Sequence, residues 1–186
     1  MTNNPTPTPY CILEHRHRYA AWAASRASST KTCRFDVNTG KRIIEAVGLP
    51  QLLKHPDLLP SCGEMDVSHN LWREAAIQAA AGHGLGGFGH GVAAKLINVY
   101  LKGAFVCGGS EMHERVMALH PPIDSLLLEE LYANDVGGHR KIWAKARKLR
   151  WSKFTAEQYQ EVIDGIRASM SGRPLWQIEE HWRGYQ

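Results

Sequence analysis

Residues 83–103 read HGLGGFGHGVAAKLINVYLKG, a glycine-rich stretch followed by a run with apolar residues at helical spacing. Five glycines fall within eight positions of this stretch: Gly84, Gly86, Gly87, Gly89 and Gly91. Glycine lets a backbone approach a phosphate without obstruction by a Cβ, and a helix N-terminus attracts negative charge. Because a helix is also predicted over residues 68–82, the pattern predicts a helix, a glycine turn and a second helix that together grip a nucleic-acid backbone. A plain flexible loop is the alternative.

The phosphates of a single nucleotide would suit the same geometry. However, the G-K-[ST] ending of a P-loop is missing and no predicted strand precedes the glycines. The stretch is therefore neither a P-loop nor a Rossmann-type loop.

Outward from this stretch, the rest of the chain also has helical patterns. Alanine-rich or amphipathic runs bounded by turn residues predict helices over 12–29, 40–48, 92–103, 112–119, 125–134, 140–151 and 156–170, with a short helix and a loop within 51–66. No segment alternates with the period of a strand, and no internal repeat is present. The predicted class is all-α, with a disordered lead-in over residues 1–9 and a single helical domain over residues 10–186.

Composition narrows the function classes. The chain has 186 residues, of which 44% are hydrophobic and 22% charged, a globular balance. No stretch approaches the roughly 20 apolar residues of a membrane span, and MTNNPTPTPY lacks the features of a signal peptide, so we expect a cytoplasmic protein without membrane contact. The four cysteines are scattered, without metal-ligand spacing. We therefore expect reduced thiols, no metal, no iron–sulfur cluster and no cofactor.

Lys95 and Asp124 are the candidate catalytic residues. Lys95 lies one turn into the helix after the glycines, where burial and the positive helix end would lower the pKa of its amine and make it nucleophilic. The alternative is an ordinary surface lysine. Asp124 follows Pro121-Pro122-Ile123 and precedes an apolar helical run. It could stabilise a cationic sugar or activate a nucleophile, although aspartate is also a leading helix N-cap residue.

The segments GFGHGVAAKLINVYLKG and HPPIDSLLLEEL resemble the helix-hairpin-helix DNA glycosylase superfamily over residues 84–131. The separation of 29 positions (124 − 95) between Lys95 and Asp124 is most similar to the archaeal 8-oxoguanine DNA glycosylase branch. Two features depart from the common pattern: Gly91 lies four residues before Lys95, and a C-terminal iron–sulfur loop is absent.

The resemblance implies a two-lobed helical fold with a glycine-rich hairpin and a cleft between the lobes. It also implies a monomer that flips a damaged or modified base out of double-stranded DNA and cleaves its N-glycosidic bond. Asp124 would stabilise the oxocarbenium-like sugar, and Lys95 would attack C1′ to form a Schiff base. If Lys95 does not attack, Asp124 would activate water and leave an abasic site. The biological role would be base excision repair or attack on modified phage DNA.

Further DNA contacts are predicted at the glycine stretch, through Gly87, Gly89 and Gly91, and in a basic helix. No acidic residue lies between Asp135 and Glu157, while seven lysines and arginines do. Such a segment suits a phosphate backbone, although charge runs are usually solvated helix faces. The predicted contacts in this helix are Arg140, Lys141, Lys145 and Lys148.

The base pocket needs an aromatic platform and polar groups. Trp22 and Arg26 share a helical face at i, i+4, and Trp176 lies near the C-terminus, so these three residues are the predicted pocket. Core packing is the alternative for each tryptophan, whereas Arg26 in an alanine-rich helix is expected to need a partner. At the level of function, two alternatives remain: a non-catalytic DNA-binding module, and a helical regulatory protein whose glycine loop contacts another protein.

Overall fold

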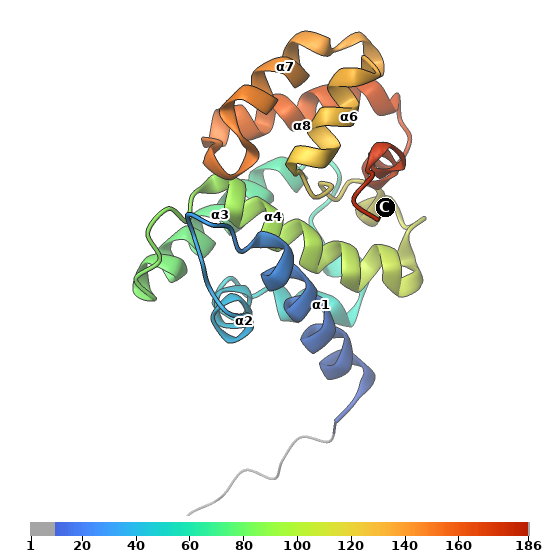
Figure 1. The fold of residues 1–186 in the computed structure, drawn as a ribbon. Helices are drawn as coiled ribbons and strands as arrows, with labels where there is room; N and C mark the ends of the chain where they lie inside the picture. Colours follow the sequence, from blue (N-terminus) through green and yellow to red (C-terminus); the bar gives the residue numbers. More distant parts are fainter. Residues whose placement is uncertain (1–9, 186) are drawn as a thin grey trace, which may run out of the picture.

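The computed structural model describes residues 10–185 and is all-helical over that range, with no strand among the described residues (Figure 1). The expected disorder of residues 1–9 lies outside the described residues. The α-helices are α1 (Ile12–Ser28), α2 (Val37–Ala46), α3 (Met65–Gly82), α4 (His90–Leu101), α5 (Glu114–Met117), α6 (Ser125–Ala133), α7 (Arg140–Leu149) and α8 (Ala156–Met170). The connections include the 3₁₀ turns η1 (Leu49–Lys54), η2 (Pro56–Leu58), η4 (Val136–Gly138), η5 (Trp151–Lys153) and η6 (Leu175–His181).

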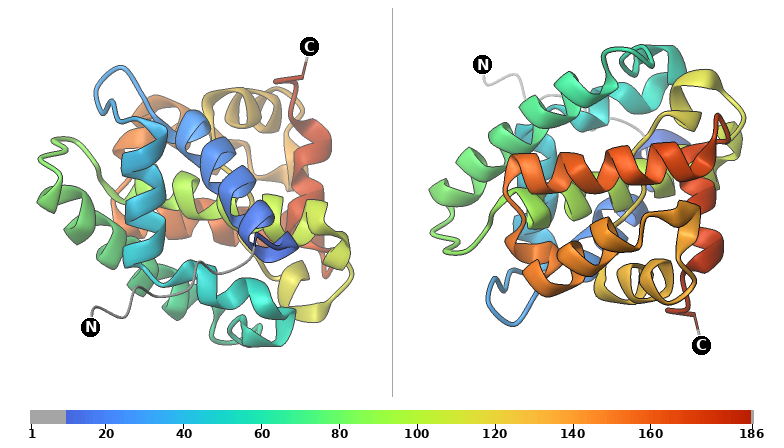
Figure 2. Two further views of the ribbon diagram at one scale, coloured as in Figure 1. Left: turned by 90° about the horizontal axis from the view of Figure 1, so that it is seen from below. Right: turned by 90° about the horizontal axis from the view of Figure 1, so that it is seen from above.

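Helix α4 is the central element. The two views of Figure 2 show α1 crossing one side of α4 and α8 crossing the other. Small residues make the α1 contact close: Ala20, Ala21 and Ala24 are fully buried, and Ala20 Cβ lies 3.6 Å from the position that a Cβ would take on Gly103. Helix α4 is almost entirely buried, as its apolar composition predicts.

Two hydrophobic clusters flank α4. The larger cluster is built on α1 to α4 and includes Ile43, Leu96 and Phe105. The smaller is built on α6 to α8 and η6 and includes Trp143 and Ile163. Trp151 packs against both clusters, so the α4–η5 contact joins the two parts of the core.

Side-chain caps fix where several helices begin. Asp36 accepts a hydrogen bond from Thr39 N at 2.8 Å at the start of α2, and Thr155 with Gln158 forms a capping box at the start of α8. Ser68, the expected cap of the third helix, lies inside α3 instead. That helix begins at Met65, directly after the Ser61–Glu64 turn.

Residues 105–111, between two predicted helices, were expected to form a loop, but the helix continues from α4 as a wide-turn π-helix, η3 (Lys102–Ser110). The combined helix His90–Ser110 is long and apolar enough, by length and composition alone, to cross a membrane. The expectation that no stretch reaches this length was therefore wrong. Of its most apolar window 61% is buried inside the protein, as in the core helix of a globular fold.

Candidate active site at Lys95 and Asp124

The connection between α3 and α4 brings the glycine stretch to the N-terminus of α4. Gly84 and Gly87 adopt positive φ of 69° and 79°, which a side chain would strain. Gly87 is exposed and Gly89 half-buried, whereas Gly91 is buried. A Cβ on Gly91 would lie 1.8 Å from the carbonyl oxygen of Trp151. Gly91 therefore has a packing role, because it lets the backbone of η5 approach α4. A DNA contact by any of these glycines stays a prediction.

The Lys95 side chain is 10% exposed, so it is not an ordinary surface lysine. Its Nζ lies 3.3 Å from Asp124 Oδ2 and 4.5 Å from the centre of the Trp151 ring. Burial lowers the pKa of the Lys95 amine, while the charge and the hydrogen bond of Asp124 oppose that shift. The arrangement holds an amine in a desolvated site with one carboxylate partner.

Asp124 uses its two oxygens differently. Oδ1 accepts from Leu127 N at 2.9 Å and caps α6, which confirms the N-cap prediction. Oδ2 accepts from Lys95 and from the indole N–H of Trp182 at 3.1 Å. The cap fixes the carboxylate, and its second oxygen stays directed at Lys95.

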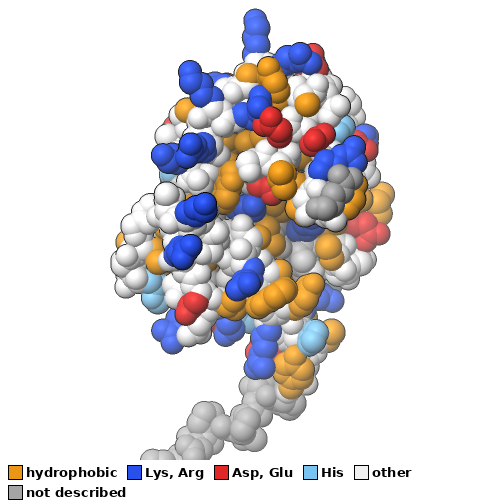
Figure 3. All heavy atoms as spheres, in the orientation of Figure 1, with side chains coloured by type: hydrophobic (Ala, Val, Ile, Leu, Met, Phe, Trp, Pro, Cys, Tyr) orange, Lys and Arg blue, Asp and Glu red, His pale blue; other side chains and the backbone are white. Residues whose placement is uncertain are grey.

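Two hollows adjoin the pair. The smaller hollow has no room for a water molecule; its lining includes Lys95, Ile123, Trp151 and Phe154. The larger is a cleft of about 650 Å³, lined by residues from 29–32, 125–129 and 147–152. Trp151 lines both hollows, whereas neither Lys95 nor Asp124 lines the cleft. Figure 3 shows this hollowed face, with basic side chains gathered along one side; the cations that line the cleft are Lys31, Arg147 and Arg150.

A second lysine–carboxylate pair lies near the first. Lys102 is seven residues (102 − 95) beyond Lys95 and forms an ion pair with Glu179 of η6. Burial raises the pKa of Glu179 against the effect of Lys102, and the charge of Asp124 adds to the rise. No local pattern in the sequence indicates this pair, because Glu179 is 77 positions from Lys102.

The structure does not bring the predicted base-pocket residues to the pair. Trp22 is 50% exposed, and Arg26 is exposed on α1, where it lines a separate cavity of about 570 Å³. No hydrogen-bond or ion-pair partner for Arg26 occurs among residues 10–185, so the expected partner is not found there. Trp176 donates to the carbonyl oxygen of Glu111 at 3.3 Å. The tryptophans that do contact the pair are Trp151 and Trp182.

The basic helix is α7, and acids from other elements compensate part of its charge. Lys145 pairs with Glu161 of α8 at 2.5 Å, and Arg140 lies 3.9 Å from Asp135. Lys141 and Lys148 are exposed and have no ion-pair partner among residues 10–185. Some cations of this segment are therefore paired, although the segment itself contains no acid.

No group of three potential metal ligands occurs in the described part of the chain. Comparisons with protein-family models, with curated proteins and with solved structures found no match to the chain.

Proposed function

We propose that the chain is a DNA glycosylase that flips a damaged or modified base out of double-stranded DNA and cleaves its N-glycosidic bond at Lys95 and Asp124. The observation that carries the proposal is the buried contact of 3.3 Å between Lys95 Nζ and Asp124 Oδ2. The two residues lie 29 positions apart and come from the two motifs that resemble the glycosylase superfamily.

The burial of this pair supports a chemical role. Desolvating two charges costs several kcal/mol per ion, so a buried ion pair adds little to stability over apolar packing. Strongly desolvated ionisable groups in contact cluster at functional sites. Burial also lowers the pKa of Lys95, which increases the fraction of neutral, nucleophilic amine at neutral pH.

The proposed chemistry follows from these positions. The neutral amine of Lys95 attacks C1′ of the flipped nucleotide while the carboxylate of Asp124 stabilises the developing positive charge on the sugar. The glycosidic bond breaks, and the base leaves with its electron pair and takes up a proton. Ring opening then gives a Schiff base between Lys95 and the sugar. If water is the nucleophile instead, Asp124 accepts its proton and the product is an abasic site.

The fold offers a place for the substrate. In this proposal the two hydrophobic clusters are the two lobes, and the glycine-rich connection is the hairpin. The cleft of about 650 Å³ beside Trp151 has the size of an ordinary ligand pocket. Lys31 and Arg150 supply positive charge for the flanking phosphates, whereas Arg147 is paired with Glu129 of the same cleft. The enzyme would act as a cytoplasmic monomer, in base repair or against modified phage DNA.

A panel of duplexes tests the proposal. Each duplex carries one altered base, such as 8-oxoguanine, 5-hydroxymethyluracil or a glucosylated 5-hydroxymethylcytosine, and base release is measured for wild type, Asp124→Asn and Lys95→Gln. We expect wild type to release at least one base and Asp124→Asn to release it about 10²- to 10⁴-fold more slowly. Asparagine keeps the α6 cap, so a lost cap does not explain the loss.

Borohydride separates the two routes. It reduces a Schiff base to a stable amine, so wild type should form a covalent adduct with a duplex that carries an abasic site, and Lys95→Gln should not. Base release without an adduct would assign the reaction to water. If no base were released from any duplex, the proposed glycosylase activity would be refuted.

A non-catalytic DNA-binding module is the second candidate. The closed hollow beside Lys95 favours this candidate, because it has no space even for a water molecule. Such a module would bind duplex DNA with the same affinity in wild type and Asp124→Asn and would release no base from either.

A further inference from the structure

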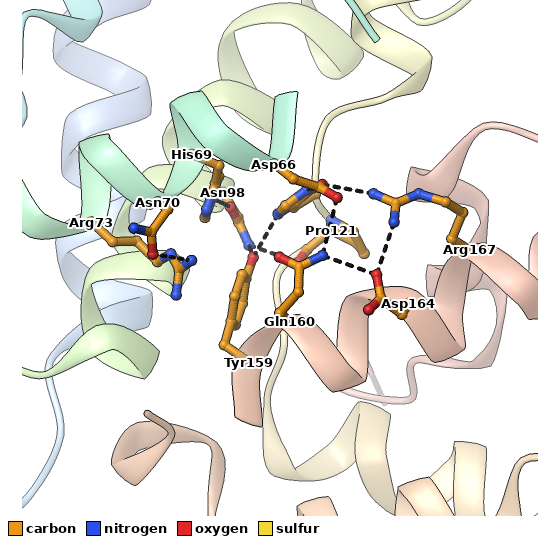
Figure 4. A network of polar contacts seen from close by, with 11 residues as sticks. Asp66, His69, Asn70, Arg73, Asn98, Pro121, Tyr159, Gln160, Asp164 and Arg167 are labelled. Atoms are coloured by element: carbon orange, nitrogen blue, oxygen red, sulfur yellow. Dashed lines mark hydrogen bonds and ion pairs between the residues drawn. The ribbon is translucent and has the colours of Figure 1, made fainter. Parts of the chain in front are cut away.

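A chain of hydrogen bonds reaches from the exposed Arg167 to the buried Asn98 of α4, close to the candidate site (Figure 4). It starts at Asp66 on α3, where Arg167 and Gln160 of α8 donate to the carboxylate at 2.7 and 3.1 Å. It continues through His120 and Tyr159 to Asn98 of α4. The chain therefore joins three helices and the segment that precedes Asp124.

The donor and the acceptor of each hydrogen bond follow from the chemical groups that it joins. The Asp66 carboxylate only accepts, so His120 Nε2, at 2.8 Å, carries the proton. Burial lowers the pKa of His120, so its ring is neutral and Nδ1 accepts from Tyr159 OH at 3.1 Å. The Tyr159 oxygen in turn accepts from Asn98 Nδ2 at 3.0 Å.

The Asn98 amide has a single orientation in this arrangement. Nδ2 donates to the Pro121 carbonyl oxygen at 2.8 Å, an atom that can only accept. Oδ1 therefore faces His69 Nε2 at 2.7 Å, which must donate. Asn98 is 2% exposed, and its side chain makes three hydrogen bonds to other residues.

The place of Asn98 in the chain links it to the candidate site. It lies three residues after Lys95 on α4, which is about one helical turn. Its partner Pro121 lies three residues before Asp124 in an extended segment. Helix α4 and this segment are thus joined twice, at Asn98–Pro121 and at Lys95–Asp124.

We propose that Asn98 is a positioning residue of this site: its amide ties α4 to the segment ending at Asp124 and so sets the separation of Lys95 Nζ and Asp124 Oδ2. His69 and Tyr159 hold the amide in the orientation that the tie requires. The inference rests on the proposed function for its catalytic consequence, but the geometry it assigns exists in the free protein.

Two variants of Asn98 and one control test the inference. Asn98→Ala removes the tie. Asn98→Asp keeps the shape and the acceptor for His69 but has no N–H for Pro121, which makes it useful if the alanine variant fails to fold. Tyr100→Phe is the control, because it removes another buried hydrogen bond of α4, to His17 Nδ1 at 2.9 Å, from a residue outside the site.

The first measurement is borohydride trapping on a duplex with an abasic site, with the Kd for the same duplex. A displacement of about 1 Å at a reacting group costs on the order of a hundredfold in rate. We expect a loss of that size in both Asn98 variants, little change in Kd, and wild-type trapping by Tyr100→Phe. Wild-type trapping rates in the Asn98 variants would overturn the inference, as would rate losses that merely follow stability across all three variants.

The second measurement needs no enzymatic activity. The lysines are reductively methylated with ¹³C, and the Lys95 signal, assigned with Lys95→Arg, is titrated by NMR in the free protein. In Asn98→Ala we expect the pKa of Lys95 to move up towards its ordinary value, because water enters the loosened pair, whereas Tyr100→Phe should leave it unchanged. An unshifted Lys95 in Asn98→Ala would overturn the positioning role. If wild type is never trapped, the lysine route of the proposed function fails, and this titration still decides the inference.

Discussion

Lys95 and Asn98 lie one turn apart on α4, but their polar atoms are bonded to very different extents. The Asn98 amide makes three hydrogen bonds, to His69, Pro121 and Tyr159. The Lys95 ammonium has three N–H donors, yet among the described residues it has one acceptor, Asp124, and otherwise faces the Trp151 ring. A saturated group holds geometry, whereas a group with unused donors can bind a further atom. One helix thus carries a polar group whose hydrogen bonds are all made and another with donors left over.

The largest effect on stability is expected inside the hydrogen-bonded network around Asn98. His120→Ala removes the ring that bonds Asp66 at one nitrogen and Tyr159 at the other. Two buried or half-buried polar groups lose a partner and a cavity forms, so the free energy of unfolding should fall by about 3 kcal/mol. Urea unfolding measures the change. Arg167→Ala, at the exposed end of the same network, is the control and should cost less than about 1 kcal/mol; equal losses would mean that burial does not decide the cost.

A smaller loss is expected where η5 touches α4. In Gly91→Ala the new methyl group would meet the Trp151 carbonyl oxygen at 1.8 Å, so the backbone must shift at a cost of about 1–3 kcal/mol. Gly89→Ala is the matched control, because nothing lies within 4 Å of its Cβ position. The shift should also displace the Trp151 ring from Lys95. Unfolding curves that do not separate the two variants would contradict this packing role.

The network should also make stability depend on pH. Burial lowers the pKa of both His69 and His120 from the ordinary value of 6.5. Below about pH 6.5 the unfolded chain binds protons at these rings that the folded chain does not, so the free energy of unfolding falls as the pH falls. The slope is at most about 1.4 kcal/mol per pH unit for each histidine. Asp66 stays ionised in this window because His120 and Arg167 hold its pKa low.

Urea unfolding at pH 7.5 and 5.5 measures the pH effect. His69→Gln removes one of the two rings and should flatten the dependence. A dependence unchanged by this variant would assign the protons to other groups.

The smallest effect on stability is expected at the Lys95–Asp124 pair when both charges are removed together. Lys95→Met combined with Asp124→Asn leaves no unpaired buried charge, keeps an apolar chain against Trp151 and keeps the acceptor for Leu127 N at the start of α6. The free energy of unfolding should therefore change by less than about 1 kcal/mol, although trapping is lost. A loss as large as that of His120→Ala would place the pair among the structural residues.

Local patterns in the sequence predicted the features that depend on near neighbours. The helical class is confirmed, as is the cap at Asp124, because helix periodicity and caps involve residues within a few positions of one another. The burial of Lys95 was also predictable, from the apolar residues that surround it on α4. The continuation of the helix beyond Gly103 was not predictable, because Gly103 packs against Ala20 of α1, a residue more than 80 positions away.

Contacts between distant elements account for the rest. The predicted pocket used Trp176, whereas Trp182 contacts Asp124 across 58 positions. Glu161 neutralises Lys145 across 16 positions, so charge counted along a segment overstated the free charge of α7. His120 and Asp66 meet across 54 positions, and neither has a local motif. Residue type and spacing cannot encode such contacts, because they depend on how the helices pack.

The hydrogen bond from the Trp182 indole to Asp124 Oδ2 also provides an optical reporter. A tryptophan beside a carboxylate emits differently once that carboxylate binds another cation. A duplex carrying a cationic pyrrolidine in place of one sugar would compete for Asp124, so the Trp182 emission would follow the arrival of DNA in real time. The difference between wild type and Trp182→Phe isolates this signal, and stopped-flow recording would then time the binding of this duplex.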